Sequence, residues 1–234
     1  MINIGTTDFF IGVPCMPRNE FEMYSTRLFD EWEAQVDKTL TLSDYSIALE
    51  LEEGSVKGVG KIAACLGALY IGIGQYGSFT SGLKTIGDQV GLVGDFLAKR
   101  SVVPFASSRC ETRIRKRKDS LTQLQRLFVK VQRREITTEQ AMSEAEALFG
   151  DEATTAPEFM HKLQESFKQA PLLPQQLKLF PDAQEQDAVV PHSEKERRPR
   201  PPRPIPFTLP PDKFRVEVWR ESKTGQRRVR VIQL

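Results

Sequence analysis

The densest group of reactive side chains in this sequence is basic. Six cations stand between positions 109 and 118, namely Arg109, Arg113, Arg115, Lys116, Arg117 and Lys118. Guanidinium and ammonium groups gathered this closely bind phosphate oxygens, either of a nucleic-acid backbone or of anionic lipid headgroups. The sequence therefore predicts an anion-binding surface, and the helical spacing of the apolar residues that follow indicates a basic helix over 109–134.

The same charges could instead be neutralised within the chain. Acidic residues are frequent between positions 139 and 165, and a chain that turns back there would bring them against the basic helix. Neither interpretation predicts that a particular base sequence is read, because no aromatic residues are interleaved with the cations and no zinc-finger spacing accompanies them.

Two stretches resemble catalytic motifs but lack the context that such motifs need. Residues 77–85 are similar to a phosphate-binding P-loop, yet an extra residue precedes the lysine and a helical pattern precedes the loop. Asp212, Glu221 and Lys223 match the PD…ExK pattern of many nucleases, in which carboxylates converge on a metal ion. Because Glu221 and Lys223 fall in an expected hairpin turn, the sequence leans against an enzyme, although the question stays open.

The metal-ligating residue types are few and scattered. The chain has three cysteines without ligand-like spacing and two histidines, His161 and His192, with no partner arrangement typical of a triad or a metal cluster. We therefore expect no metal, no cofactor and no disulfide framework. The first residues do not form a basic segment followed by an apolar run, so we expect no secretory signal and a cytoplasmic location, with membrane association as the alternative.

Small residues recur unusually often in the middle of the chain. We expect a hairpin of two helices there, over about 56–75 and 79–99, with a self-association or packing stripe formed by Gly60, Ala64, Ala68, Gly72, Gly87 and Gly91. Glycine costs a helix about 1 kcal/mol relative to alanine. Close approach of a second helix is the usual compensation for that cost.

The same hairpin suggests a membrane alternative. No charged residue lies between Lys61 and Lys84, and an uncharged stretch of that length could reach across a bilayer core of about 30 Å. Polar residues such as Gln75 and Ser78 interrupt the stretch. A tightly packed helical hairpin inside a globular core is therefore the first interpretation, and a membrane-inserting hairpin is the second.

The remaining elements define an α+β fold. We predict a mostly helical core with the glycine-rich hairpin, a small antiparallel sheet, and a C-terminal β-hairpin after a Pro-rich linker. We expect a short strand over 8–13, one half-buried strand or two very short ones within 39–53, and a β-hairpin over 213–234. We expect further helices over about 20–38, 137–149 and 155–169. The predicted organisation is a domain over 1–168, a flexible linker over 169–212, and a hairpin over 213–234 that docks on the domain or on a partner.

Three functions remain open at this point. The first is a non-enzymatic protein–protein interaction or self-assembly protein, whose partner is another protein or a second copy in a homo-oligomer. The second is a membrane-active effector that inserts the hairpin and binds anionic lipid. The third is a nucleic-acid-binding protein that uses the basic helix over 109–134. No small-molecule substrate is indicated by the sequence.

Overall fold

The architecture is built around one antiparallel sheet. The computed structural model describes residues 1–234 except 14, 106–111, 118 and 172–212. Its six-stranded sheet has the order β4-β1-β3-β2-β5-β6. The strands are β1 (Ile2–Ile11), β2 (Ser46–Glu52), β3 (Val56–Ala64), β4 (Thr112–Arg117), β5 (Phe214–Arg220) and β6 (Arg228–Gln233). The class is α+β, as the sequence predicted.

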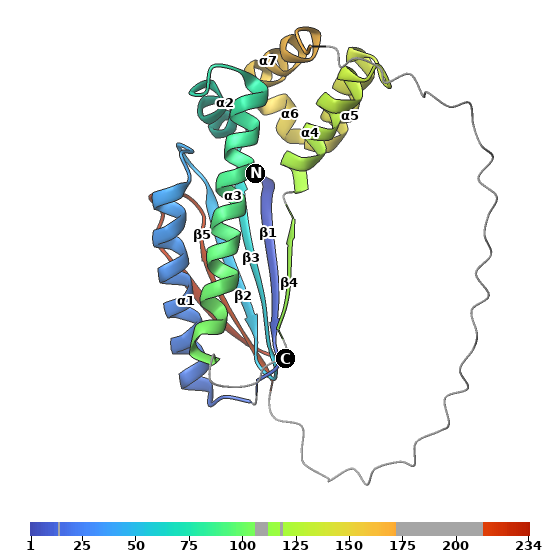
Figure 1. The fold of residues 1–234 in the computed structure, drawn as a ribbon. Helices are drawn as coiled ribbons and strands as arrows, with labels where there is room; N and C mark the ends of the chain where they lie inside the picture. Colours follow the sequence, from blue (N-terminus) through green and yellow to red (C-terminus); the bar gives the residue numbers. More distant parts are fainter. Residues whose placement is uncertain (14, 106–111, 118, 172–212) are drawn as a thin grey trace, which may run out of the picture. The chain divides into compact units, whose positions relative to one another are not determined.

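The first four strands follow a known topology. The chain runs β1, α1 (Arg18–Thr39), β2, β3, α2 (Leu66–Gly74), α3 (Phe79–Val102) and β4. With the spatial order β4-β1-β3-β2, this is the split β-α-β arrangement also called ferredoxin-like, with α2 inserted before α3. Helices α1 and α3 lie along the same face of the sheet (Figure 1). This topology defines the fold and carries no function by itself.

Glycines in β3 allow the helices to lie close to the sheet. A Cβ atom on Gly60 would be 2.3 Å from Cδ2 of Leu97 in α3 and 3.3 Å from the indole of Trp32 in α1. A Cβ atom on Gly58 would be 2.0 Å from the ring of Phe9 in β1. The large core side chains therefore occupy the space that β3 leaves empty, which is a recognised use of glycine inside a strand.

A second group of helices surrounds the N-terminal end of α3 (Figure 1). It consists of α2 and of α4 (Asp119–Gln132), α5 (Thr138–Phe149), α6 (Asp151–Thr155) and α7 (Pro157–Lys168). Aromatic contacts join these helices, with ring centroids 5.7 Å apart for Phe79 and Phe128 and 4.4 Å apart for Phe128 and Phe167. Thr137 begins α5 with a complete capping box that includes Gln140.

Several predicted elements are confirmed. The helices expected over 20–38, 137–149 and 155–169 are α1, α5 and α7, although α7 begins two residues later than predicted, and the C-terminal hairpin is β5 and β6. The strand expected at 8–13 is the end of a longer strand, β1, and the alternating stretch over 39–53 contains β2. The hairpin joins the sheet by antiparallel pairing of β5 with β2. Most of the predicted linker lies outside the described residues.

The helix predicted over about 56–75 is wrong in its first half. Val56–Ala64 forms β3, and only Leu66–Gly74 is helical. Gly60 and Ala64 therefore do not share a helix with Ala68 and Gly72. Residues 56–64 form a strand and not a helix because Gly58 and Gly60 allow the close contacts described above, whereas two glycines would destabilise a helix.

The basic helix predicted over 109–134 is also wrong in its first part. Thr112–Arg117 forms the edge strand β4, which pairs with β1, and the helix begins only at Asp119. Arg109 and Lys118 lie outside the described residues. Among the described helices, none is both long enough and apolar enough to cross a membrane.

The close contact between α2 and α3 gives a first prediction. Replacing Gly82 by alanine should lower the free energy of unfolding by about 1–3 kcal/mol. The added Cβ atom would lie 2.6 Å from the carbonyl oxygen of Ile73 and 2.8 Å from its Cα, and backbone cannot move aside as a side-chain tip can. Urea unfolding followed by circular dichroism measures the change.

The matched control is Gly67→Ala in α2, where a Cβ atom would meet nothing within 4 Å. This variant should keep the stability of the parent or gain up to about 1 kcal/mol from the better helix propensity of alanine. Equal destabilisation by the two substitutions would contradict the close helix contact.

Candidate nucleic-acid interface

Strand alternation places every second residue of the sheet on the face opposite α1 and α3. The cross-strand register aligns these residues in three rows that run from β4 to β6. The first row contains Arg113, Phe10, Lys57, Glu52, Arg215 and Ile232. The second row contains Arg115, Asp8, Val59, Glu50, Glu217 and Arg230. The third row contains Arg117, Thr6, Lys61, Ala48, Trp219 and Arg228. We call these residues the open face, because α1 and α3 lie along the other side of the sheet.

The open face is predominantly positive. It carries eight basic residues and four acidic ones. The two edge strands supply five of the cations: Arg113, Arg115 and Arg117 on β4, and Arg228 and Arg230 on β6. All five are exposed, whereas the four carboxylate residues are only partly exposed. The outer layer of this surface is therefore cationic along both edges.

Ion pairs neutralise only part of this charge. Lys61 contacts Glu50 at 2.6 Å, and Arg117 contacts Asp8 at 3.0 Å. Arg215 forms an ion pair with Glu52, and Arg228 contacts Glu221 at 2.7 Å beside the turn of the hairpin. Exposed pairs of this kind contribute little stability and can exchange partners at low cost.

Three cations of the open face are still available for a ligand. Within the described part of the chain, Arg115, Lys57 and Arg230 have no ion-pair partner. They lie on β4, β3 and β6 respectively, so they are spread over the full width of the sheet.

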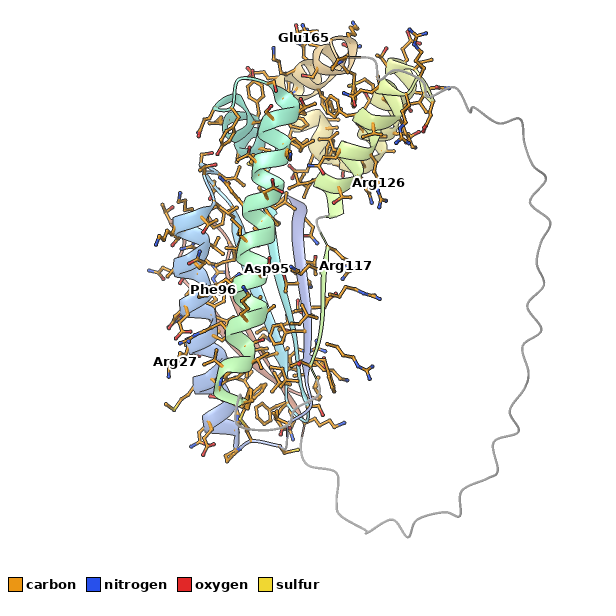
Figure 2. The ribbon with its side chains drawn as sticks, viewed as in Figure 1. Arg27, Asp95, Phe96, Arg117, Arg126 and Glu165 are labelled. Carbon is orange, nitrogen blue, oxygen red and sulfur yellow. The ribbon has the colours of Figure 1, made fainter. Side chains whose placement is uncertain are left out.

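The predicted basic cluster is divided by the strand. Arg113, Arg115 and Arg117 belong to the open face, but Lys116 lies on the opposite side of β4 and forms an ion pair with Asp95 of α3. Figure 2 shows Arg117 extending from β4 and Asp95 on α3. A helix would have spread these side chains around its axis, whereas the strand aligns three of the four on one surface.

Helix α4 shows the predicted internal neutralisation in part. Lys130 contacts Glu144 of α5 at 3.1 Å, as predicted. Just after the end of α4, Arg133 contacts Glu135 at 3.7 Å, a carboxylate outside the predicted acidic segment. Arg126, labelled in Figure 2, is exposed and forms no ion pair with any described residue.

The small residues proposed for self-association are occupied by contacts within the chain. Gly60 lies in β3 beneath Leu97, and a Cβ atom on Gly72 would be 2.7 Å from Leu42. Ala64, Ala68 and Gly87 are buried, and Gly91 lies on α3 beside a cavity of about 270 Å³ between this helix and the sheet. Self-association through these residues stays a prediction.

The residues of the nuclease-like pattern do not converge among the described residues. Glu221 and Lys223 lie at the turn between β5 and β6, where Glu221 contacts Arg228, and the backbone N–H of Lys223 donates to Asp44 at 2.8 Å. Asp212 lies outside the described residues. No cluster of histidine, cysteine and carboxylate side chains suited to a metal ion occurs in the described part of the chain. The P-loop-like stretch is the beginning of α3, which Ser78 caps by accepting a hydrogen bond from the N–H of Ser81.

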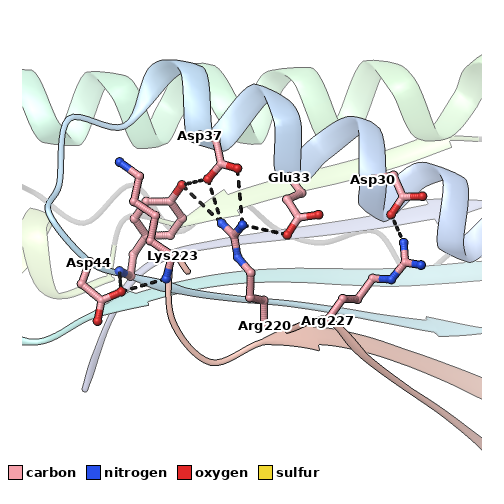
Figure 3. A network of polar contacts seen from close by, with 8 residues as sticks. Asp30, Glu33, Asp37, Asp44, Arg220, Lys223 and Arg227 are labelled. Atoms are coloured by element: carbon pink, nitrogen blue, oxygen red, sulfur yellow. Dashed lines mark hydrogen bonds and ion pairs between the residues drawn. The ribbon is translucent and has the colours of Figure 1, made fainter. Parts of the chain in front are cut away.

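An ionic cluster around the buried guanidinium of Arg220 holds β5 and β6 in place beneath α1 (Figure 3). The guanidinium of Arg220, at the end of β5, contacts Glu33 at 2.9 Å and Asp37 at 2.8 Å, both on α1. The hydroxyl of Tyr45 donates to the same Asp37 carboxylate. Arg227 forms a further ion pair with Asp30 of α1. The hairpin of β5 and β6, whose strand β6 forms one of the two cationic edges, is therefore tied to helix α1.

The pKa shifts in this cluster follow from burial and charge. Burial raises the pKa of Glu33, and the positive charge of Arg220 opposes that rise only in part. For Asp37, burial acts in the same direction, but hydrogen bonds from Arg220 and Tyr45 outweigh it and lower the pKa. The ionised form of Asp37 is thus stabilised by Arg220, as expected for a charge-assisted hydrogen bond.

A second surface feature is an apolar groove of about 890 Å³ along α1. Its lining includes Met23 and Val229, which are 73% and 48% exposed, and Val103 at the end of α3. Arg100 and Glu31 form an ion pair at its side, and the hydrogen bond from Arg100 lowers the pKa of Glu31 to about 2. The groove therefore combines exposed apolar side chains with fixed charges.

Reasoning from the sequence missed most of the open face. The helix predicted over about 56–75 includes Lys57 and Lys61, and the sequence pattern does not connect Phe10, Trp219 and Arg230 with the basic cluster. One signal was present, since Lys57, Val59 and Lys61 alternate with Gly58, Gly60 and Ile62 in the pattern of a half-exposed strand. Comparison with protein-family models, curated proteins and solved structures finds no match to this chain.

The ionic cluster gives a second prediction. Arg220→Met should lower the free energy of unfolding by about 1.5–3 kcal/mol, because Glu33 and Asp37 lose the cation that hydrogen-bonds and compensates their partly exposed charges. Chemical denaturation at neutral pH measures this loss.

The control is a variant that also carries Glu33→Gln and Asp37→Asn. Removing the uncompensated charges should restore a substantial part of the lost stability. A triple variant that is no more stable than Arg220→Met would show that the ionic cluster does not act through charge compensation.

Proposed function

We propose that this protein binds nucleic acid through the open face of its sheet. The observation that carries the proposal is the placement of Arg113, Arg115 and Arg117 on one edge and of Arg228 and Arg230 on the other, all on the same face. Five strand spacings separate the two edges, a width of about 24 Å. A surface of this width with cations along both sides suits a polyanion that crosses the strands.

Phosphate recognition on this surface requires no enzymatic chemistry. Arginine forks and lysine ammonium groups bind backbone phosphates and release counterions, which gives affinity without base readout. The three cations that are free of ion pairs within the described chain, Arg115, Lys57 and Arg230, supply the first contacts. The paired arginines can follow, since exposed ion pairs are easily exchanged.

The length of α2 favours nucleic acid over a membrane as the partner. The helix has nine residues, a length of about 14 Å. A bilayer core is about 30 Å thick. The membrane-active function remains an untested alternative, and binding of anionic vesicles in place of oligonucleotides would support it.

The proposal predicts a salt-dependent affinity that the open face controls. In the variant with Arg115→Gln and Arg230→Gln, binding to a fluorescent 12-nucleotide thymidine oligomer should weaken at low salt. The slope of log K against log salt should become shallower by about 1.4, because each lost phosphate contact removes about 0.7 from the slope for a single strand. Fluorescence anisotropy over a potassium chloride series measures both quantities.

Two controls separate this surface from net charge. The variant Lys38→Gln with Lys84→Gln removes the same charge from exposed positions on α1 and α3, and Lys116→Gln changes the opposite side of β4. Both controls should keep the affinity and slope of the parent. The proposal fails if the controls lose as much affinity as the open-face variant, or if the parent binds no oligonucleotide at low salt.

We also propose self-association as a second function, supported by the apolar groove along α1. Met23 and Val229 are exposed apolar side chains that line the same groove, and grouped exposed apolar surface is typical of interaction sites. If two copies meet there, Met23→Glu should turn a concentration-dependent dimer into a monomer in light scattering. Ile71→Glu, at an exposed apolar residue outside the groove, is the control. A parent that stays monomeric at every concentration would eliminate this function.

A further inference from the structure

The open face also carries two aromatic side chains that are cross-strand neighbours of its cations. Phe10 lies in β1, between its cross-strand neighbours Arg113 of β4 and Lys57 of β3. Trp219 lies in β5, next to Arg228 of β6. Both aromatic side chains are partly exposed. Neither belongs to the core on the helical side of the sheet, where the large apolar residues of this protein are otherwise concentrated.

A path of small and apolar residues connects the two aromatics. It runs diagonally across the rows of the open face, from Phe10 through Val59 of β3 to Ala48 of β2, which is the direct neighbour of Trp219. Phe10 and Trp219 are three strands and four residues apart, a separation of about 20 Å. One ion pair crosses this path, between Lys61 of β3 and Glu50 of β2 at 2.6 Å, and these two partly exposed side chains have to move aside for a flat ligand.

We propose that the ligand is a single-stranded polynucleotide whose bases stack on Phe10 and Trp219, an inference that rests on the proposed function. The bases would lie on the diagonal between the two aromatics, and the phosphates would contact the arginines of the edges. Every base has a flat π-surface, so stacking of this kind tolerates any sequence. The separation of the two rings requires a strand of several nucleotides that binds both at once.

The arrangement disfavours a double helix at this surface. In a duplex the flat faces of the bases are already stacked on one another, and only their edges are accessible in the grooves. A flat sheet that offers aromatic rings gains contact with base faces only when the bases are unpaired. The cations alone would bind both forms, so the two aromatics provide the discrimination between them.

The experiment compares three probes that differ in their bases: the 12-nucleotide thymidine oligomer, an abasic oligomer of the same length, and a 12-base-pair duplex. The full chain should bind the thymidine oligomer about a hundredfold more tightly than the abasic one, because the abasic oligomer loses both stacking contacts and separated contacts add in free energy. Phe10→Leu and Trp219→Leu should each reduce thymidine binding about tenfold and leave abasic binding unchanged. A uridine oligomer run in parallel shows whether DNA and RNA are distinguished.

Two further measurements guard against misfolded variants and indirect effects. Phe96→Leu makes the same change at a partly buried phenylalanine of α3, on the helical side of the sheet, and should bind like the parent. Trp219 should also report stacking directly, through quenching of tryptophan fluorescence by the thymidine oligomer. The quenching should disappear in Trp219→Phe, which retains the buried Trp32.

The outcomes separate this inference from the function on which it rests. Equal affinity of the parent for the thymidine and abasic oligomers, or unchanged thymidine binding by the two aromatic variants, would overturn stacking and leave phosphate binding in place. Tighter binding of the duplex than of the single strand would also overturn it. If the parent binds none of the probes at low salt, the proposed function itself fails.

Discussion

The arrangement of the sheet depends on a guanidinium that lies between a helix and a strand. Arg220 is only 6% exposed, and its contacts with Glu33 and Asp37 tie the end of β5 to α1. Strands β5 and β6 contribute Trp219, Arg228 and the other residues at one side of the open face. Without this tie, the hairpin would depend on its pairing with β2 and on apolar contacts such as that between Phe214 and Phe21. The ionic cluster thus sets the width of the surface on which binding is proposed.

The two sides of the sheet differ in composition and packing. On the helical side, glycines of β3 make room for Trp32 and Leu97, so α1 and α3 lie close to the strands. On the open face, partly exposed carboxylates such as Glu50 and Asp8 lie beneath more exposed cations. The acids limit repulsion between neighbouring basic strands, and the cations remain outermost. The strand β4 shows the difference within a few residues, since Lys116 contacts Asp95 of α3 while Arg115 belongs to the open face.

Helices with a clear apolar stripe could be predicted from the sequence, as α1, α5 and α7 show. Local signals helped for two of them, a capping box at the start of α5 and a proline in the first turn of α7. The two strands that matter most for the site could not. In β3 the inward positions include Gly58 and Gly60, so the alternation of large apolar side chains that identifies a strand is missing. In β4 every described residue is exposed and Ile114 is the only apolar one, so no apolar alternation separates this stretch from the helical pattern of α4. Which residues share the open face depends on the pairing register of strands that are far apart in the chain. Local sequence patterns carry no information about that register.

The position of the hairpin in the chain has a consequence for how the protein folds. Arg220 and Asp37 are 183 residues apart, and the pairing of β2 with β5 closes a loop of similar length. Contacts of such sequence separation form late, because the entropy of closing the loop is lost before the contacts compensate for it. During folding, β2 would therefore pass through a stage with one edge unpaired, and such an edge can recruit a strand from another chain. The yield of correctly folded protein should accordingly depend on how dilute the folding chains are.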